Sequence, residues 1–430
     1  MATMLATLLL GCAPPVEHVT ASVHDDPVNV ATIEFTSASD LPAHVEYGPT
    51  ADYGFSTPVD AGGVDHTIDV IGLLADTCYH YRVVLEDGDE DLSGEDHTFT
   101  TQPLPADLPL PTVEGTDRTG GNAIFTVQQA GAEMWAAAYA LDGAGNVVWY
   151  DTVDGLVLGA HTSRDGRALN IQVSHPSQGD ADGSAILTVP FNGGETTEIA
   201  VPFAHHDFVE MEDGSFVSIV SVIEDRDGEA VQGDALVRVD RDGNSEEIWN
   251  AFDTLPLEEN EGWDLQPIDW THANGMDWDP VHHLFAVSLF RQKQVLLIDE
   301  DGAVLNTLGV DGDFTFVDDP GFGPQHGPKF TEGGMQLFDN AGDGVSRVVE
   351  YAIDAETQTL TPRWELSHPW GAQVVVMGDA VRTPSGQVVS AWGEKGDLLT
   401  TSADGQVSRR VLMGGTIGRL SWREDLYPTE

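Results

Sequence analysis

Hydrophobic and polar residues alternate with a period of two between residues 17 and 102, which is typical of half-buried β-strands. Turn residues interrupt this alternation every 8 to 12 positions. The alternating segments are residues 30–35, 44–47, 66–71, 77–85 and 97–101. Short strands at this spacing predict a small antiparallel β-sandwich over residues 17–102.

One segment of this region has a more specific pattern. Residues 73–83, LLADTCYHYRV, resemble the strand of a fibronectin type III-like domain that carries a tyrosine corner. Domains of this kind usually position a neighbouring domain and do not catalyse a reaction themselves. A stiff, extended linker is predicted at residues 103–111, because prolines occupy positions 103, 105, 109 and 111.

From residue 112 to residue 427 the pattern changes to short apolar strands joined by turns that contain Gly, most often Asp-Gly. Hairpins of this kind lie at residues 142–151, 164–171, 212–220, 241–249, 300–308, 384–392 and 403–411. No stretch of this region shows a sustained period of 3.6 residues, so no helices are expected to cover parallel sheets. Repeated hairpins over such a length predict a β-propeller, and the chain is predicted to be all-β.

Three histidines keep the same position relative to a turn. His206 lies eight residues before Gly214, His272 eight before Pro280, and His326 eight before Gly334. If each segment begins with the innermost strand of its blade, the three rings face one mouth of the central channel. Asn274, two residues after His272, shares its strand face. A single buried histidine is most often a core residue, but three in register predict a functional site.

The chain is strongly acidic, with 72 acidic and 18 basic residues and a formal net charge of −54. Such a surface repels nucleic acids and anionic lipids, so nucleic-acid binding is excluded. Acidic turns such as residues 299–302 and 240–243 resemble calcium loops, but none completes the EF-hand spacing. Because cations are scarce, an Arg or Lys near a candidate site is more informative than usual.

Residues 1–16 are predicted to be a signal segment. Their apolar run is too short to span a bilayer, and it ends in Leu9-Leu10-Gly11-Cys12, which resembles a bacterial lipobox. We therefore expect an exported lipoprotein of the periplasm or the outer-membrane or cell surface, in contact with the membrane only through lipidated Cys12. No Lys or Arg precedes the run, which departs from the pattern. The alternatives are cleaved soluble export and an apolar N-terminus without a targeting role. Cys78 is the other cysteine, so neither a disulfide nor a Cys-based metal site is expected.

The segments around the three histidines are similar to the bacterial aryl sulfotransferases, the arylsulfate sulfotransferase (ASST) family. They follow the family's order and are His205–Phe208, Asp269–Gly275, Arg291, Gln325–Pro328 and Leu337–Asn340. The resemblance covers roughly residues 112–427. It implies a six-bladed propeller that transfers a sulfuryl group from an aryl sulfate donor to a phenolic acceptor, with no cofactor. It also implies a location in the periplasm or cell envelope.

The resemblance also implies roles for individual residues. His326 matches the nucleophile that is transiently sulfated, and His206 matches the family's remaining histidine. His272, Asn274 and Arg291 match residues that surround the sulfuryl group. His205 is adjacent to His206 and is the alternative to it.

Elementary chemistry agrees with these roles. A neutral imidazole suits attack on an anionic sulfate ester, and a guanidinium matches the sulfuryl oxygens. His272 or His206 is expected to protonate the leaving phenolate, and Asn274 to donate a hydrogen bond. Lys329 is expected to be a solvated turn residue.

Two tryptophans near the histidines have alternative interpretations. Trp263 and Trp270, in and next to the segment 258–269, are predicted to form a wall or lid for an aromatic ring. Core packing is an equally good explanation for both side chains.

Two other classes of function are compatible with the sequence. Three converging histidines could bind zinc or copper, although a nearby Arg291 is unfavourable beside a divalent metal, so no metal ligand is assigned. The propeller could also be a non-enzymatic envelope scaffold. The sequence does not separate a transferase from a hydrolase that uses water, and it does not identify donor, acceptor or oligomeric state.

Overall fold

The computed structural model describes residues 15–88, 91–115, 120–129, 135–174, 183–258, 261–342, 344–402 and 404–428. Cys12 and nearly all of the predicted signal segment lie outside these residues. The chain divides into two compact units, residues 1–106 and residues 107–430. No helix in the described ranges is long and apolar enough to cross a membrane.

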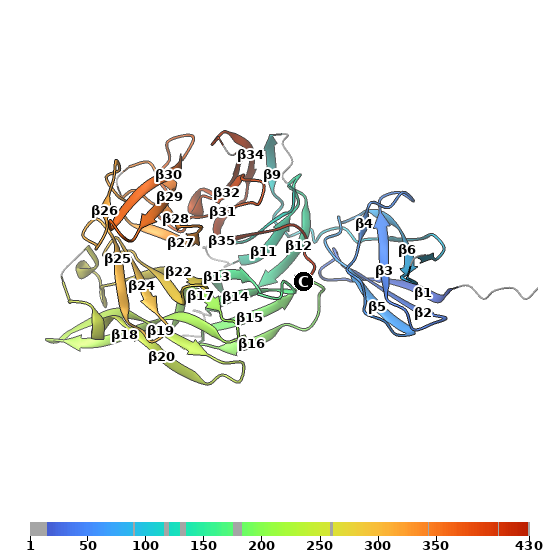
Figure 1. The fold of residues 1–430 in the computed structure, drawn as a ribbon, viewed down its shortest axis with the longest axis horizontal. Coiled ribbons are helices and arrows are strands. Elements are labelled where there is room, and N and C mark those ends of the chain that lie inside the picture. Colours follow the sequence, from blue (N-terminus) through green and yellow to red (C-terminus); the bar gives the residue numbers. More distant parts are fainter. Residues whose placement is uncertain are drawn as a thin grey trace, which may run out of the picture. The chain divides into compact units, whose positions relative to one another are not determined.

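The first unit contains two antiparallel sheets that pack face to face (Figure 1). One sheet consists of β1 (Val16–Val23), β2 (Ala31–Ser37) and β5 (Asp65–Val70). The other consists of β3 (Ala43–Gly48), β4 (Phe55–Ser56), β6 (Cys78–Leu85), β7 (Leu92–Ser93) and β8 (His97–Thr100). Alternate side chains of both sheets form one apolar core, so the predicted sandwich is confirmed.

The corner of this sandwich depends on one tyrosine. The N–H of Leu74 donates a hydrogen bond of 2.9 Å to the hydroxyl oxygen of Tyr79, the bond that defines a tyrosine corner. Cys78 beside it is an exposed free thiol. The likeness to fibronectin type III domains stays a prediction.

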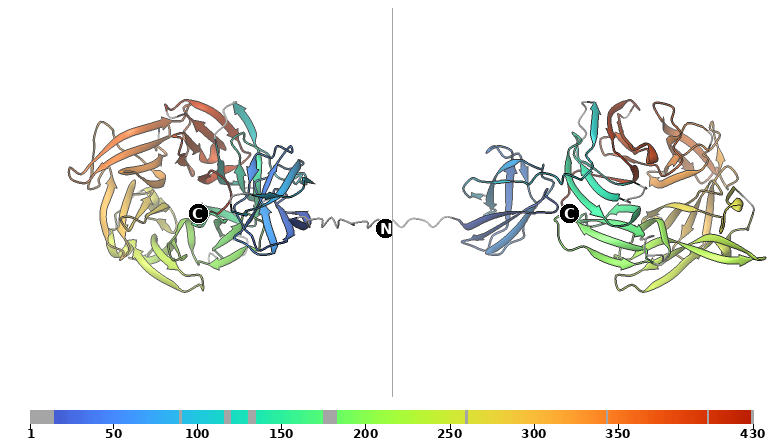
Figure 2. Two further views of the ribbon diagram at one scale, coloured as in Figure 1. Left: turned by 45° about the vertical axis from the view of Figure 1, so that its right-hand side comes forward. Right: turned by 180° about the vertical axis from the view of Figure 1, so that it is seen from behind.

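The described strands of the second unit form six sheets arranged around a common axis (Figures 1 and 2). Blade 1 consists, from its innermost strand outward, of β35 (Thr416–Arg423), β10 (Asn122–Gln129), β11 (Trp135–Leu141) and β12 (Val147–Val153). Blade 2 consists of β13 (Leu156–Thr162), β14 (Ala168–Ser174), β15 (Ala185–Pro190) and β16 (Thr197–Ala200). Blade 3 consists of β17 (Ala204–Glu210), β18 (Phe216–Arg226), β19 (Glu229–Val239) and β20 (Ser245–Asn250).

The remaining blades repeat this plan. Blade 4 consists of β22 (Ala273–Asp279), β23 (Leu284–Leu289), β24 (Gln294–Asp299) and β25 (Val304–Gly309). Blade 5 consists of β27 (Gln325–Thr331), β28 (Gly334–Asp339), β29 (Arg347–Asp354) and β30 (Thr359–Ser367). Blade 6 consists of β31 (Asp379–Arg382), β32 (Val388–Ala391), β33 (Asp397–Thr401), β34 (Val407–Leu412) and β9 (Thr112–Gly115).

Both ends of the second unit close the ring. The C-terminal strand β35 pairs with β10 as the innermost strand of blade 1, and the early strand β9 pairs with β34 at the outer edge of blade 6. The innermost strands β35, β13, β17, β22, β27 and β31 contact one another in that circular order. The expected six-bladed β-propeller is therefore confirmed.

Short additional elements follow blades 3 and 4. Between β20 and β22 lie α1 (Ala251–Thr254), a 3-10 turn (Glu261–Asp264) and β21 (Ile268–Asp269), which pairs in parallel with β19. After blade 4, β26 (Thr315–Phe316) pairs in parallel with β30. A second 3-10 turn (Gly393–Lys395) lies in blade 6.

The acidic turns that resemble calcium loops have a structural use. In the turn after β19, Asp240 Oδ1 accepts hydrogen bonds from the N–H groups of Asp242 and Asn244, and Gly243 has a φ of 84°. Asp299 Oδ1 accepts two backbone hydrogen bonds in the same way after β24. These carboxylates hold tight hairpins, as Asp side chains commonly do in turns.

Carboxylates also join neighbouring blades at the innermost strands. Asp207 Oδ2 in blade 3 accepts the N–H of Met276 in blade 4 at 3.0 Å. Asp277 Oδ2 in blade 4 accepts the N–H of Phe330 in blade 5 at 2.7 Å. An equivalent bond of 2.9 Å joins Leu420 N to Asp379 Oδ2, from blade 1 to blade 6. Each bond satisfies a polar group that would otherwise be costly to bury.

Candidate functional site

The three in-phase histidines lie at the start of innermost strands in three consecutive blades. His206 is in β17, His272 directly precedes β22, and His326 is the second residue of β27. The register of each strand against its neighbour shifts at this point, between Ala204 and Phe208, Ala273 and Gly275, and His326 and Lys329. Such β-bulges re-aim side chains and are common next to active sites.

The backbone at these positions is unusual as well. His206 has a φ of 61° and His272 a φ of 51°, and Gly327 after His326 has a φ of 53°. A non-glycine residue in this left-handed region is destabilised by about 1–2 kcal/mol. At Gly327 a Cβ atom would lie 2.9 Å from Asp379 Oδ1 and 3.2 Å from Arg419 Nη1, so only glycine fits. Backbone strain at His206 and His272 is consistent with a functional site.

The histidine rings lie close together, in a row that one phenylalanine completes. The ring centroids of His206 and His272 are 4.9 Å apart. The ring of Phe290 lies 5.4 Å from that of His272 and 5.7 Å from that of His326. The structure thus brings together all three histidines predicted from their spacing.

His326 is 5% exposed and has one fixed partner. Its Nδ1 lies 2.7 Å from Asn340 Oδ1. The amide nitrogen of Asn340 donates to the carbonyl oxygens of Val374 and Met377, at 2.9 and 3.0 Å. The amide oxygen is therefore an acceptor, and His326 Nδ1 must carry the hydrogen. This tautomer leaves a lone pair on His326 Nε2.

His326 is also held in its neutral form. Burial lowers its pKa to about 3, and the positive charge of Arg419 acts in the same direction, against the opposing effect of the Asn340 hydrogen bond. At neutral pH the ring is thus an uncharged imidazole with a free Nε2, which is the form a nucleophile requires.

His272 has a charged partner in place of a neutral amide. Its Nδ1 lies 2.8 Å from Asp269 Oδ2, and the same oxygen accepts hydrogen bonds from Arg291 Nε at 3.0 Å and Nη2 at 2.6 Å. Burial alone would raise the pKa of Asp269, but His272 and Arg291 hold it below its ordinary value. Arg291 is therefore part of an ion pair at the site, with its side chain 16% exposed.

Asn274 lies at the site but faces protein atoms. Its side chain is fully buried, its Nδ2 donates to the carbonyl oxygen of Gln325 at 2.8 Å, and its Oδ1 accepts from Ser288 Oγ at 2.7 Å. Gln325 directly precedes His326. This placement makes Asn274 a residue that positions the backbone of His326, whereas the sequence predicted a direct donor to the sulfuryl group.

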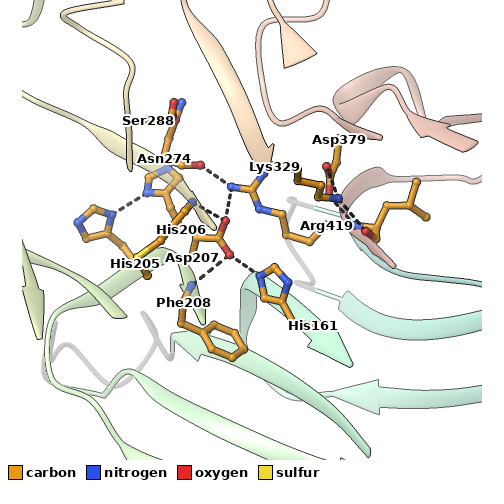
Figure 3. A network of polar contacts seen from close by, with 12 residues as sticks. His161, His205, His206, Asp207, Phe208, Asn274, Ser288, Lys329, Asp379 and Arg419 are labelled. Carbon is orange, nitrogen blue, oxygen red and sulfur yellow. Dashed lines mark hydrogen bonds and ion pairs between the residues drawn. The ribbon is translucent and has the colours of Figure 1, made fainter. Parts of the chain in front are cut away.

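His205 and His206 contact each other through their Nδ1 atoms, 2.7 Å apart (Figure 3). Burial lowers the pKa of His206 well below its ordinary value, and the proximity of His205 and His272 adds to the effect. His205 Nε2 lies 2.9 Å from the buried carboxylate of Asp234, whereas the ring of His206 lies 4.9 Å from that of His272. His206 is thus the member of the pair that faces the other site histidines.

A buried network of charged residues next to these rings was not predicted from the sequence (Figure 3). Asp207 lies 2.9 Å from Arg419 Nη2 and 2.6 Å from His161 Nε2. Burial alone would raise the pKa of Asp207, but Arg419 and His161 hold it below its ordinary value. Arg419 is 3% exposed, and its Nη2 also donates to the backbone oxygen of Asn274. A second guanidinium therefore lies close to the site histidines.

The prediction for Lys329 was wrong. Lys329 is not a solvated turn residue but part of β27, with its side chain 23% exposed. Its Nζ lies 2.7 Å from Asp379 Oδ1 and donates to the carbonyl oxygens of Ala380 and Leu420. The glycines and prolines around His326 suggested a turn, but they allow a bulged innermost strand. The scarcity of basic residues is the signal that could have indicated a specific role for Lys329.

The structure describes the side chain of Trp270 but not that of Trp263. Trp270 is 1% exposed and packs against Phe252, with 5.1 Å between ring centroids, in the apolar core of blades 3 and 4. This placement matches the core-packing alternative and not an accessible wall. The side chain of Trp263 lies outside the described part of the structure.

The convergence of three histidines makes a metal ion an alternative ligand for the site. Within the described residues, no group of three or more His, Cys, Asp or Glu side chains is arranged to hold a metal ion. The Nδ1 atoms of His326 and His272 are used by Asn340 and Asp269.

Comparison with known proteins gives one family. Residues 112–316 match the family model described as Arylsulfotransferase (ASST). The matched segment includes His206, His272, Asn274 and Arg291, and it ends before His326. No curated protein matched the chain.

The solved structures that match the chain are distant from it in sequence. A protein of unknown function from Bacteroides caccae is 12% identical, with a TM-score of 0.47, and the match covers 70% of this chain and 98% of that one. Virginiamycin B lyase from Staphylococcus aureus is 12% identical, with a TM-score of 0.39 and coverage of 70% and 88%. A gluconolactonase from Xanthomonas campestris is 13% identical, with a TM-score of 0.37 and coverage of 72% and 98%. The similarity to the arylsulfotransferase (ASST) family therefore rests on the sequence match of residues 112–316.

Proposed function

We propose that the protein is an aryl sulfotransferase that transfers a sulfuryl group from an aryl sulfate to a phenol through a sulfated His326. The observation that carries this proposal is the state of His326. Its ring is neutral, its Nδ1–H is fixed by Asn340, and Nε2 is left with a lone pair. The arylsulfotransferase domain supplies the expectation that the substrate is a sulfate ester.

In the first half-reaction, His326 Nε2 attacks the sulfur atom and the bond between sulfur and the aryl oxygen breaks. The phenolate leaves with the bonding electrons and takes up a proton. The imidazole ring becomes positively charged as the N–S bond forms, and Asn340 Oδ1 then accepts a stronger hydrogen bond from Nδ1–H. The Asn340 contact therefore favours the transition state over the resting enzyme.

His272 is the better candidate for the acid that protonates the phenolate, with His206 as the alternative. A carboxylate accepts only, so Asp269 fixes one hydrogen of His272 on Nδ1, and the doubly protonated ring carries the transferable proton on Nε2. When a second phenol attacks the sulfuryl group, His272 takes that phenol's proton and the N–S bond breaks. The enzyme returns to its starting state.

Two guanidinium groups supply positive charge for the sulfuryl oxygens. Arg291 is held by Asp269 at the partly exposed side of the site, and Arg419 lies buried beside Asn274. Preorganised charge of this kind stabilises a developing anion without reorganisation. Asn274 contributes by holding the backbone that precedes His326.

The test is to incubate the purified protein with 4-nitrophenyl sulfate, with and without added phenols. Phenol release and the fate of the sulfuryl group are followed together. Transfer to the added phenol supports the proposal, whereas release of free sulfate at the same rate with and without phenol indicates a hydrolase. No release under any condition would refute catalysis and leave the scaffold interpretation.

We also propose that Cys12 anchors the exported protein to a membrane through a lipid. The native chain should then partition into the detergent phase with membranes, whereas Cys12→Ser should yield precursor or soluble protein. Equal partitioning of the two forms would contradict the lipid anchor.

A further inference from the structure

We propose that the side chain of Phe290 forms a single aryl-binding subsite, used in turn by the donor and the acceptor. This inference rests on the proposed function, because it names the surface that binds the aromatic part of both substrates. Its starting point is the position of the ring. Phe290 lies between His272 and His326, which belong to different blades, at centroid distances of 5.4 and 5.7 Å.

The local sequence gives no structural reason for an aromatic ring here. Phe290 stands in the turn between β23 and β24, a position where polar residues and glycine are usual. It belongs to neither of the apolar clusters on the two sides of blade 4, which include Phe285 and Phe314. The residue is only partly buried. A partly exposed apolar ring beside two site histidines, with Arg291 Cζ 5.7 Å from its centroid, suits the aromatic part of an anionic ligand.

The turn is tied to the backbone of the site, so the ring is held in place before a substrate binds. The N–H of Phe290 donates to the carbonyl oxygen of His272 at 3.1 Å, and the N–H of Arg291 donates to that of Thr271 at 3.3 Å. The two bonds fix Phe290 and Arg291 together. An aromatic group and a guanidinium, adjacent in sequence, match the two ends of an aryl sulfate.

The reaction geometry places the substrate ring near Phe290. For in-line transfer, the aryl oxygen must depart on the side of sulfur opposite His326 Nε2, where the proton donor also acts. Phe290 flanks both His326 and His272. Among the described aromatic side chains, it is the one whose ring lies within stacking distance of both. Aromatic pairs with centroids about 4.5–7 Å apart are favourable.

A single subsite has a kinetic consequence. The first phenol must leave before the second can bind to the same ring surface, so the released phenol and the acceptor phenol compete for one form of the enzyme. This order agrees with a covalent intermediate, since the sulfuryl group stays on His326 during the exchange.

The experiment measures equilibrium binding on a His326→Asn background, which prevents turnover. The probes are 4-methylumbelliferyl sulfate and inorganic sulfate. Phe290→Leu should weaken binding of the aryl sulfate about 2- to 10-fold, the range expected for loss of one aromatic contact, with little change for inorganic sulfate. Phe290→Tyr, which keeps the aromatic ring, should weaken binding of the aryl sulfate by a smaller factor. The matched control is Phe316→Leu, whose ring packs on Phe322 and Tyr351.

Equal weakening for both probes, or aryl sulfate binding no weaker than in the Phe316→Leu control, would overturn the inference. Native protein supplies the separate readout for the proposed function. If it transfers sulfuryl groups while Phe290→Leu binds aryl sulfate normally, the subsite alone is wrong. If it transfers none, the proposed function fails, whatever the binding shows. A released phenol that inhibits without competing against the acceptor would also contradict a single subsite.

Discussion

Blades 4 and 5 each present a histidine at the same position of the fold, yet the two histidines have opposite partners. His272 in blade 4 has its Nδ1 on the carboxylate of Asp269, which also binds Arg291. His326 in blade 5 has its Nδ1 on the neutral amide of Asn340. A carboxylate favours a ring that gains and loses protons, whereas an amide fixes the tautomer without favouring the charged form. The same hairpin thus yields an acid in one blade and a nucleophile in the next.

The largest effect should follow from removing the carboxylate partner in blade 4. Asp269→Asn should lower kcat/KM by about 100- to 1,000-fold, because His272 loses its fixed proton and Arg291 its anchor. The loss should be smaller for donors whose phenol is a good leaving group, such as 4-nitrophenyl sulfate, than for phenyl sulfate. Steady-state rates over a series of aryl sulfates check this.

The chain offers a matched control for that variant. Asp279 accepts a hydrogen bond from His282 Nδ1 at 2.6 Å with the same spacing of three residues, on an exposed turn. Asp279→Asn should leave the rates unchanged. A loss in Asp269→Asn that is independent of the leaving group would contradict the assignment of His272 as the acid.

A smaller effect is expected when the charge of Arg291 is kept and its shape is changed. Arg291→Lys should slow formation of the sulfated enzyme by roughly 30- to 150-fold, equivalent to about 2–3 kcal/mol, because a point charge replaces a two-pronged donor. The sulfated His326 should still form. Rapid-quench measurement of the label on the enzyme tests this. The control is Arg363→Lys, because Arg363 forms an ion pair with Glu350 away from the site.

Removal of the neutral partner in blade 5 should have a smaller effect still. Asn340→Ala frees His326 Nδ1, so the ring no longer has one enforced tautomer, and we expect a loss of about 1–2 kcal/mol, or roughly 5- to 30-fold. In contrast to Asp269→Asn, the loss should be the same for every leaving group. If the loss of activity instead grows as the leaving group becomes poorer, the histidines of the two blades do not act separately as an acid and a nucleophile.

Replacement of Asp277, a residue of blade 4 away from the histidines, should change the stability of the protein and leave its reaction rate unchanged. Burial raises the pKa of Asp277 to about 6. The folded protein therefore holds a proton that the unfolded chain loses near pH 4, and this contribution to stability disappears as pH rises through about 6. Asp277→Asn should remove that slope and raise the free energy of unfolding at pH 7 by roughly 2–3 kcal/mol. Denaturant titrations between pH 4 and 7 check this; equal slopes in both proteins would contradict it.

The sequence was a good guide wherever a feature repeats with the blades. The position of His206, His272 and His326 before the turns predicted their convergence, because each segment supplies an innermost strand at the same phase. The alternation of apolar residues and Asp-Gly turns predicted the propeller itself. Repeated spacing carries three-dimensional information because each repeat is one unit of the fold.

Features that depend on contacts between distant segments were not predictable in this way. Arg419 reaches Asn274 only because the C-terminal strand β35 closes blade 1 from inside. Asn340 belongs to the Leu337–Asn340 segment that resembles the family, but its role depends on the carbonyl groups of Val374 and Met377. Asn274 faces the backbone of another blade, which strand periodicity does not reveal.

The central claim is that His326 carries the sulfuryl group, and mass spectrometry of the quenched enzyme tests it most directly. Protein mixed with excess aryl sulfate and digested without acid should yield a peptide containing Gln325–Lys329 that is heavier by one sulfuryl group. The label should vanish when a phenol is added, and His326→Ala and His326→Asn should show neither label nor turnover. A His326→Ala protein that releases phenol at close to the native rate would contradict the account.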